Sequence, residues 1–206
     1  MKYLILCFSF FIFLSNNSFA QIKIEVNKSG MMGGTFFINI EENESSLLVH
    51  LRIKEELKNT TEYQEQMKPL TGKFLELMEI YPRTSDSIKV MIKKIELLRE
   101  EFTLYSDYRL NVSSTEHSDY FNVIHEITHR SIESLERKEQ NKNRIVLDGH
   151  FVSVEVFKED FQKEILVHSP REKSHPEIYA LINSTLNIFR ENELIPNEPQ
   201  LKTLGY

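Results

Sequence analysis

The chain has 206 residues, of which 40% are hydrophobic and 27% are charged, and its formal net charge is −6 at pH 7. This length is enough for one domain with a substantial hydrophobic core. The acidic balance argues against nucleic acid as a partner, because nucleic-acid binders concentrate positive charge on one surface. We therefore expect no nucleic-acid binding.

The N-terminal residues have the order of a secretory signal peptide. Met1-Lys2 is a short basic start, Tyr3–Leu14 is apolar, and Ser18 and Ala20 are small residues at positions −3 and −1 of a cleavage site. The apolar run is too short to span a membrane well. We predict cleavage after Ala20, export through a Sec signal to the periplasm or the extracellular space, and no transmembrane span in the mature chain.

Cys7 is the only cysteine, and it lies inside this signal. The mature chain would then have neither a disulfide nor a thiol nucleophile. A disulfide-free exported domain must be held together by its hydrophobic core.

Alternating apolar and polar residues follow the signal. Ile22, Ile24 and Val26 alternate with Lys23 and Glu25, which is typical of a half-buried strand. Two similar runs come next, separated by a glycine-rich turn and a polar loop. The sequence predicts an antiparallel meander over Gln21–Asn27, Thr35–Ile40 and Leu47–Ile53.

The central part of the chain has apolar residues at helical spacing. Pro69 and Gly72 weaken the first helical stretch, so we expect a kink or a late start near Pro69. Ser85 is placed to cap the second helix. The pattern predicts three central helices, ending at Tyr81, running from about Ser85 to Phe102, and covering about Glu116–Glu139, with a short strand at Arg109–Val112 before the third.

The C-terminal region combines strand, turn and cap signals. Asp148-Gly149 is a tight-turn dipeptide, Ser169-Pro170 ends the last alternating run, and Ser174 with Glu177 fits a helix capping box. These signals predict strands at Arg144–Asp148, His150–Phe157 and Phe161–His168, and a helix over Glu172–Asn192 that lies on the apolar face of the sheet.

Together the elements predict an α+β fold, with an N-terminal meander and a C-terminal hairpin region packed with three central helices and a C-terminal helix. No repeat or linker divides the mature chain. We expect a signal peptide over 1–20, one domain over 21–193 and an irregular tail over 194–206.

One motif has the spacing of a metal site. His125-Glu126-Ile-Thr-His129 lies on the third predicted helix. Imidazoles at i and i+4 share a helix face and can bind Zn²⁺ together, while the adjacent glutamate can act as base toward a metal-bound water. The five residues resemble the core motif of zincin metallopeptidases, which implies His125 and His129 as ligands and Glu126 as the base.

Other features of this helix favour a solvated face. Arg130 and Ser131 follow the second histidine, where zincins have apolar or uncharged residues, and no third histidine follows at zincin spacing. His125 lies at the edge of the apolar stripe and His129 lies outside it. We expect i,i+4 ion pairs Glu126–Arg130 and Glu133–Arg137. A third ligand from elsewhere stays open, and the candidates are His117, His150, His168 and His175.

The chain resembles small uncharacterised exported proteins of Bacteroidota in a few short features. These are Gln21 directly after the signal, Leu147-Asp-Gly149, Ser169-Pro170, and His175-Pro176 before the closing helix. This resemblance covers the signal and about the last sixty residues. It implies an α+β domain of the cell envelope and carries no catalytic residues over.

The sequence thus favours an exported, non-enzymatic protein that binds a protein partner and needs no cofactor, for example an immunity-type inhibitor that occludes a toxin. The alternative is a zinc-dependent metallopeptidase that uses His125, Glu126 and His129. A purely structural envelope component is compatible with the same sequence.

Overall fold

The computed structural model describes residues 20–28, 35–43, 45–146, 149–158, 161–197 and 206. The predicted signal, apart from Ala20, lies outside these residues. Ala20 itself is buried, with 2% of its surface exposed.

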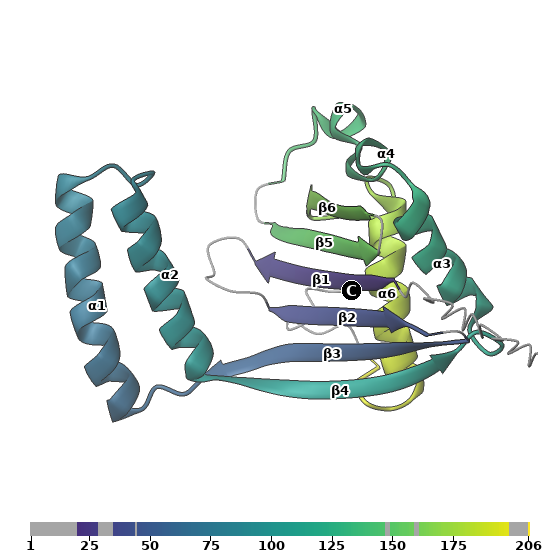
Figure 1. Cartoon of the computed structure of the whole chain (residues 1–206), viewed down its shortest axis with the longest axis horizontal. Helices are drawn as coiled ribbons and strands as arrows, with labels where there is room; N and C mark the ends of the chain where they lie inside the picture. Colours follow the sequence, from purple (N-terminus) through teal and green to yellow (C-terminus); the bar gives the residue numbers. More distant parts are fainter. Residues whose placement is uncertain (1–19, 29–34, 44, 147–148, 159–160, 198–205) are drawn as a thin grey trace, which may run out of the picture.

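A single antiparallel sheet forms the centre of the molecule (Figure 1). Its strand order is β4-β3-β2-β1-β5-β6, so the N-terminal meander and the C-terminal hairpin belong to one sheet, joined where β1 pairs with β5. The predicted α+β class is confirmed. The strands are β1 (Gln21–Lys28), β2 (Phe36–Glu42), β3 (Ser46–Leu57), β4 (Thr103–Ser113), β5 (His150–Lys158) and β6 (Phe161–His168).

Two strand predictions differ from the structure. Arg144–Val146 forms no strand, and the remainder of that predicted strand, Leu147 and Asp148, lies outside the described residues. β4 is much longer than the predicted Arg109–Val112, because it pairs with β3 along most of its length. Pairing with a long neighbour extended a strand whose own alternation is weak.

The described helices that pack on the sheet cover one of its faces. In Figure 1 the long helix α6 lies behind the strands, and α3 packs against it. The core between them is apolar; Phe36 and Phe189 are its largest fully buried side chains, and each such side chain contributes about 1.5–3 kcal/mol. The helices are α1 (Thr61–Ile80), α2 (Asp86–Glu101), α3 (Ser118–His129), α4 (Ile132–Glu136), α5 (Lys138–Asn141) and α6 (Pro176–Glu191).

The helical hairpin α1–α2 is inserted between β3 and β4 and projects from one end of the sheet (Figure 1). The hydrogen bond from Lys58 N–H to Phe102 O, at 2.8 Å, closes its base. Thr60 and Ser85 cap the two helices. The late start of α1 near Pro69 is wrong, because the Thr60 cap starts the helix earlier and Pro69 lies inside it.

The third predicted helix is divided into α3, α4 and α5. The backbone of Arg130 is extended, with ψ at 152°, and Ser131 then caps α4 by accepting a hydrogen bond from Ser134 N–H. Arg137 has φ at 48°, which ends α4. A single helix over Glu116–Glu139 is therefore wrong, since the chain must turn here to reach the β6 edge.

The start of α6 also differs from the prediction. The N-cap residue is His175, which makes no side-chain capping bond. Ser174 Oγ instead bonds backbone atoms of Arg171, and Glu177 reaches two arginines, so the predicted capping box does not form. Tertiary ion pairing competes for the glutamate that a capping box needs.

Within the predicted tail, Leu194–Asn197 forms neither helix nor strand. Tyr206 is buried, and its hydroxyl lies 2.7 Å from His150 Nε2.

Candidate functional site: the open face of the sheet

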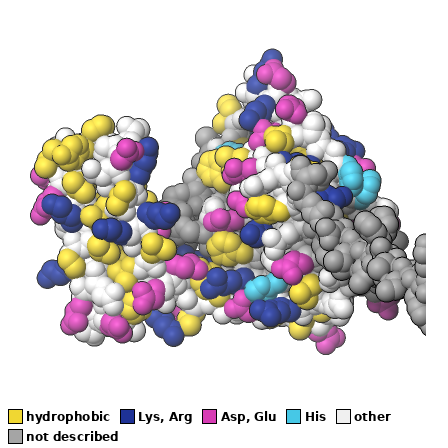
Figure 2. All heavy atoms as spheres, viewed as in Figure 1, with side chains coloured by type: hydrophobic (Ala, Val, Ile, Leu, Met, Phe, Trp, Pro, Cys, Tyr) yellow, Lys and Arg dark blue, Asp and Glu magenta, His cyan; other side chains and the backbone are white. Residues whose placement is uncertain are grey.

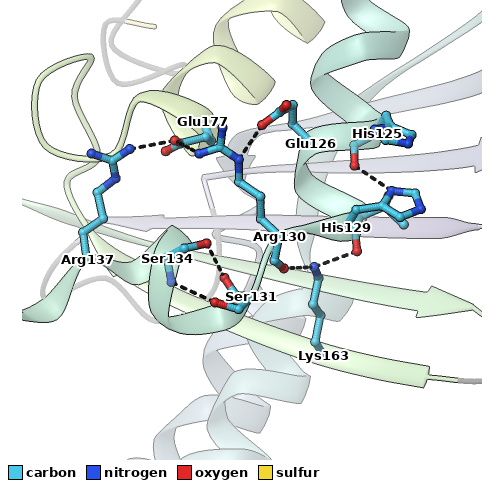
Figure 3. A network of polar contacts seen from close by, with 10 residues as sticks. His125, Glu126, His129, Arg130, Ser131, Ser134, Arg137, Lys163 and Glu177 are labelled. Atoms are coloured by element: carbon cyan, nitrogen blue, oxygen red, sulfur yellow. Dashed lines mark hydrogen bonds and ion pairs between the residues drawn. The ribbon is translucent and has the colours of Figure 1, made fainter.

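The zincin-like motif lies on the exposed side of α3, near its end. His125 and His129 are both exposed, and their rings stack with centroids 4.0 Å apart (Figure 3). His129 Nδ1 lies 2.9 Å from His125 O, so one ring nitrogen is occupied by the helix backbone. The predicted position at and outside the edge of the apolar stripe is confirmed.

Glu126 and its neighbours form an ion-pair network between helices (Figure 3). Glu126 pairs with Arg130 as predicted. Arg130 also reaches Glu177 of α6 at 2.6 Å, and Arg137 reaches the same oxygen at 2.7 Å. The predicted Glu133–Arg137 pair is absent among the described residues, because Glu177 takes that arginine. The carboxylate of Glu126 is thus held by a cation.

The candidate third ligands have other neighbours. His150 bonds Tyr206, His175 Nε2 donates to Glu136 O at 3.1 Å, and the His168 ring stacks on Phe151. His117 is the N-cap residue of α3. Within the part of the chain that the structure describes, no three His, Cys, Asp or Glu side chains group as metal ligands.

The sheet face opposite the helices is turned toward the viewer in Figures 1 and 2, and no described helix covers it. We call it the open face. It holds a hollow of about 350 Å³ at the centre of the sheet, spanning the four strands β5, β1, β2 and β3. The polar and aromatic side chains around the hollow are Lys23, Glu25, Phe37, Asn39, His50, Arg52, Ser153 and Glu155.

Arg52 is a cation of the open face that contacts both an aromatic ring and carboxylates. Its guanidinium stacks on the Tyr105 ring at 3.8 Å and lies 3.5 Å from a Glu100 oxygen. Glu100 belongs to the last turn of α2 and also accepts a hydrogen bond from the Tyr105 hydroxyl. Burial and this carboxylate raise the pKa of the Tyr105 phenol. Arg52 therefore ties the base of the helical hairpin to the wall of the hollow.

His50 and Asp107 form a second polar pair beside Arg52. His50 Nε2 lies 2.8 Å from Asp107 Oδ1, and Arg52 Nε lies 3.9 Å from the same oxygen. These three side chains come from neighbouring strands in matching register, since Arg52 is directly opposite Asp107. Among the described residues, no Ser, Thr or Cys side chain forms a hydrogen bond with this pair.

Asn39 lies at the centre of the sheet and has an unmet hydrogen-bonding group. Its amide nitrogen donates to Glu41 at 2.8 Å, while its Oδ1 is buried without a partner. Buried polar atoms in native proteins are nearly always bonded, so an orphaned acceptor needs an explanation. Asn39 lines the hollow, so a donor on a bound partner would satisfy this oxygen once the side chain turns toward the opening.

Exposed apolar side chains gather on the open face and on the hairpin. Leu48, Phe151 and Leu166 belong to the open face by their sheet register, and Figure 2 shows apolar, acidic and basic side chains intermingled there. On the hairpin the most exposed apolar residues are Leu75, Ile80, Tyr81, Val90 and Leu97. Of the most exposed large apolar residues in the described chain, only Ile145 and Leu194 lie elsewhere.

The alternation in the sequence predicts half-buried strands with a polar side, but it does not bring these polar residues together in one site. The sequence does indicate that Lys23, Glu25, His50 and Arg52 lie on the polar sides of their strands, because each alternates with apolar residues. Their grouping required the strand order and register, which local patterns do not specify.

No helix in the described part of the chain is long and apolar enough to cross a membrane. Comparison of the chain with protein-family models, with curated proteins and with solved structures finds no match.

Proposed function

We propose that this protein is an exported, non-enzymatic binding module that recognises a protein partner through its open face. The observation that carries the proposal is the hollow of about 350 Å³ on that face, with the unpartnered Asn39 Oδ1 in its wall. A solvated face is ordinary for an antiparallel sheet, whereas a hollow with a buried, unpartnered acceptor in its wall is not.

The residues around the hollow are of the types that carry binding energy. Arg52, Tyr105 and Phe37 form one cluster, since the guanidinium stacks on the Tyr105 ring and the two aromatic rings meet edge to face at 6.1 Å. Arginine and aromatic residues dominate the energetic centres of protein interfaces. The cluster is already ordered by Glu100, so binding would cost little side-chain entropy.

The partner is expected to match this mixture of charges. The open face offers both signs, with Lys23 and Arg52 beside Glu25 and Glu155, and it adds apolar contacts from Phe151. A protein surface with interspersed charges and a hydrogen-bond donor at its centre would complement it. An immunity-type inhibitor that occludes a toxin is one concrete form of this proposal.

The test uses partner capture followed by affinity measurement. A photo-crosslinking residue at position 37 captures proteins from the periplasmic or secreted fraction of the source cells, and the captured protein is purified. Its affinity is then measured for the parent, for Arg52→Glu and for Ser153→Arg, whose side chain would fill the hollow. Each variant should bind at least about tenfold more weakly, the effect of losing one interface centre.

Lys173→Glu, at an exposed position before α6, is the matched charge-reversal control and should bind like the parent. Circular dichroism establishes that each variant is folded. If the parent and both open-face variants bind the captured partner with equal affinity, the binding surface lies elsewhere and the proposal is wrong. Enzymatic inhibition of the captured partner by the parent would identify the inhibitor form.

A second candidate function, a zinc-dependent peptidase, is favoured by the two exposed, neighbouring imidazoles of His125 and His129. The sharpest test is metal content of the purified protein beside His129→Ala. About one zinc per chain that is lost in the variant would favour the peptidase. A parent without zinc, with the variant folded alike, would leave the motif as a surface feature of α3.

A further inference from the structure

The chain covers one edge of its sheet with its own residues. At the β6 edge, Glu136 Oε1 of α4 accepts a hydrogen bond from Leu166 N–H at 3.1 Å. Lys163 of β6 also donates to Thr128 O at 2.8 Å and to Arg130 O at 2.7 Å. An uncovered edge strand is a template for pairing with another chain, so these contacts close that route at β6.

At the opposite edge, no described strand pairs with the outer side of β4. β4 is an end strand of the sheet, and Figure 1 shows the hairpin α1–α2 past the ends of the strands and not along the length of β4. β4 runs over eleven residues, which is long for an exposed edge. The two edges therefore differ in a way that favours pairing at β4.

The register identifies the backbone groups that β4 presents. Ser114 N–H bonds Ser45 O at 3.2 Å, in line with the pairing of Val112 with Leu47. The backbone N–H and C=O groups alternate in direction along a strand. Those of the even-numbered residues of β4 therefore bond β3, and those of the odd-numbered residues point outward from the free edge of the sheet. The outward residues are Tyr105, Asp107, Arg109 and Asn111, and no hydrogen bond from another described residue reaches their backbone groups.

The charges at these positions are self-complementary. Asp107 and Arg109 are two residues apart, and both are exposed. If β4 paired antiparallel with β4 of a second copy about a twofold axis at Tyr108, Asp107 of each copy would lie directly opposite Arg109 of the other. The symmetry would therefore produce two identical pairs of opposite charges. Opposite charges in such cross-strand pairs stabilise pairing, while like charges oppose it.

The side chains are available for these contacts. Arg109 makes no ion pair with another described residue, and its cross-strand neighbour in β3 is His50, which pairs with Asp107. His50 and Arg52 both contact Oδ1 of Asp107, so Oδ2 remains to accept from a second copy. A carboxylate accepts several hydrogen bonds at once.

We propose that β4 is a homodimer interface, in which β4 pairs antiparallel with β4 of a second copy about a twofold axis at Tyr108. The four outward residues exchange backbone hydrogen bonds in the pairs Asp107 with Arg109 and Tyr105 with Asn111. The two sheets then become one continuous sheet whose open faces lie on the same side. The pairing does not depend on the function proposed above.

Exposed edges often carry charge to prevent association, and that role must be distinguished from pairing. Charges of one sign, lysine above all, block an edge because every self-pairing register brings like charges together. Several registers satisfy the outward backbone groups, and the spacing of Asp107 and Arg109 brings unlike charges together in the one centred on Tyr108. The pattern therefore selects a register instead of forbidding all of them.

The experiment is sedimentation velocity of the mature protein from about 1 to 200 µM, since an interface limited to one strand pair belongs to the small, weak class. The parent should dimerise in a concentration-dependent way. Arg109→Asp should lose dimerisation, because acidic side chains would then face each other, and Asp107→Arg should lose it in the same way. The double variant Asp107→Arg with Arg109→Asp should regain it, because the charges again alternate.

Two further variants make the result decisive. Asn111→Pro removes an outward N–H and leaves the hydrogen bonds to β3 intact, so it should abolish dimerisation without unfolding the sheet. Arg83→Asp, in the exposed turn between α1 and α2, is the matched control and should dimerise like the parent. A parent that stays monomeric throughout this range, or a dimer that survives both Arg109→Asp and Asn111→Pro, would overturn the proposal.

Discussion

At the scale of single residues, the two glutamates that pair with Arg130 differ in how far they are buried. Glu177 has only 11% of its side chain exposed and receives both Arg130 and Arg137, while Glu126 is 48% exposed and pairs with Arg130 alone. Exposed pairs contribute little because solvent screens them, whereas losing the anion of a half-buried cluster leaves cations without a partner.

Glu177→Gln should therefore lower the free energy of unfolding by about 1–3 kcal/mol, and Glu126→Gln should lower it by no more than about 1 kcal/mol. Urea denaturation followed by circular dichroism measures both values. Equal effects of the two variants would contradict this ranking and would mean that burial does not decide the strength of the network.

His150 makes stability depend on pH. Burial, aided by nearby cations, lowers the pKa of its imidazole to about 4. Between this value and the ordinary pKa near 6.5 the unfolded chain binds more protons than the folded chain, so stability rises with pH and is fully present above about 6.5. The stability lost on acidification to pH 4 should be on the order of 3 kcal/mol.

His150→Gln removes the titrating group and should flatten this part of the curve of unfolding free energy against pH. The measurement is chemical denaturation at several pH values between 4 and 7. His175, whose pKa burial also lowers, contributes in the same direction and would leave a smaller residual slope. An unchanged slope in the variant would show that other groups control acid sensitivity.

At the scale of elements, α1 carries two residues that weaken helices. Pro69 lies inside the helix and cannot donate to the preceding turn, and Gly72 has open space where a side chain would be. Both positions are exposed. The caps at Thr60 and the packing of Tyr63 against Phe102 nevertheless keep the helix continuous.

Pro69→Ala should stabilise α1 by about 1–3 kcal/mol and Gly72→Ala by about 0.5–1 kcal/mol. Amide hydrogen exchange across α1 is the appropriate measurement, because the hairpin can open without unfolding of the sheet. Slower exchange within α1 in both variants is expected, with the larger change for Pro69→Ala. Faster exchange in Pro69→Ala would mean that the proline makes a contact the helix needs.

At the scale of the whole molecule, the sheet with α3 and α6 forms the core, and the hairpin is an insertion. Its two helices bury Ile88, Met91 and Ile95, and the hydrogen bond between Lys58 and Phe102 holds its ends side by side. A segment whose ends meet in this way can be removed without separating β3 from β4.

Replacement of Asn59–Glu101 by an Asn-Gly turn should therefore leave a folded sheet. The expected result is a cooperative thermal transition and unchanged amide chemical shifts for core residues such as Ile24 and Phe189. Aggregation of this variant would show that the hairpin is needed to form the β3–β4 pair.

Alternation and helical spacing are local properties, so they were enough to predict the α+β class, most strands and helices, and the exposed position of His125 and His129. Tertiary structure decided the rest. Pairing with β3 extended β4, ion pairing drew Glu177 away from its capping role, and the turn at Arg130 divided the third helix. The hollow could be found only from the tertiary structure, because Lys23, Arg52 and Ser153 come from strands far apart in the chain. The pairing register of those strands places the three side chains on one face.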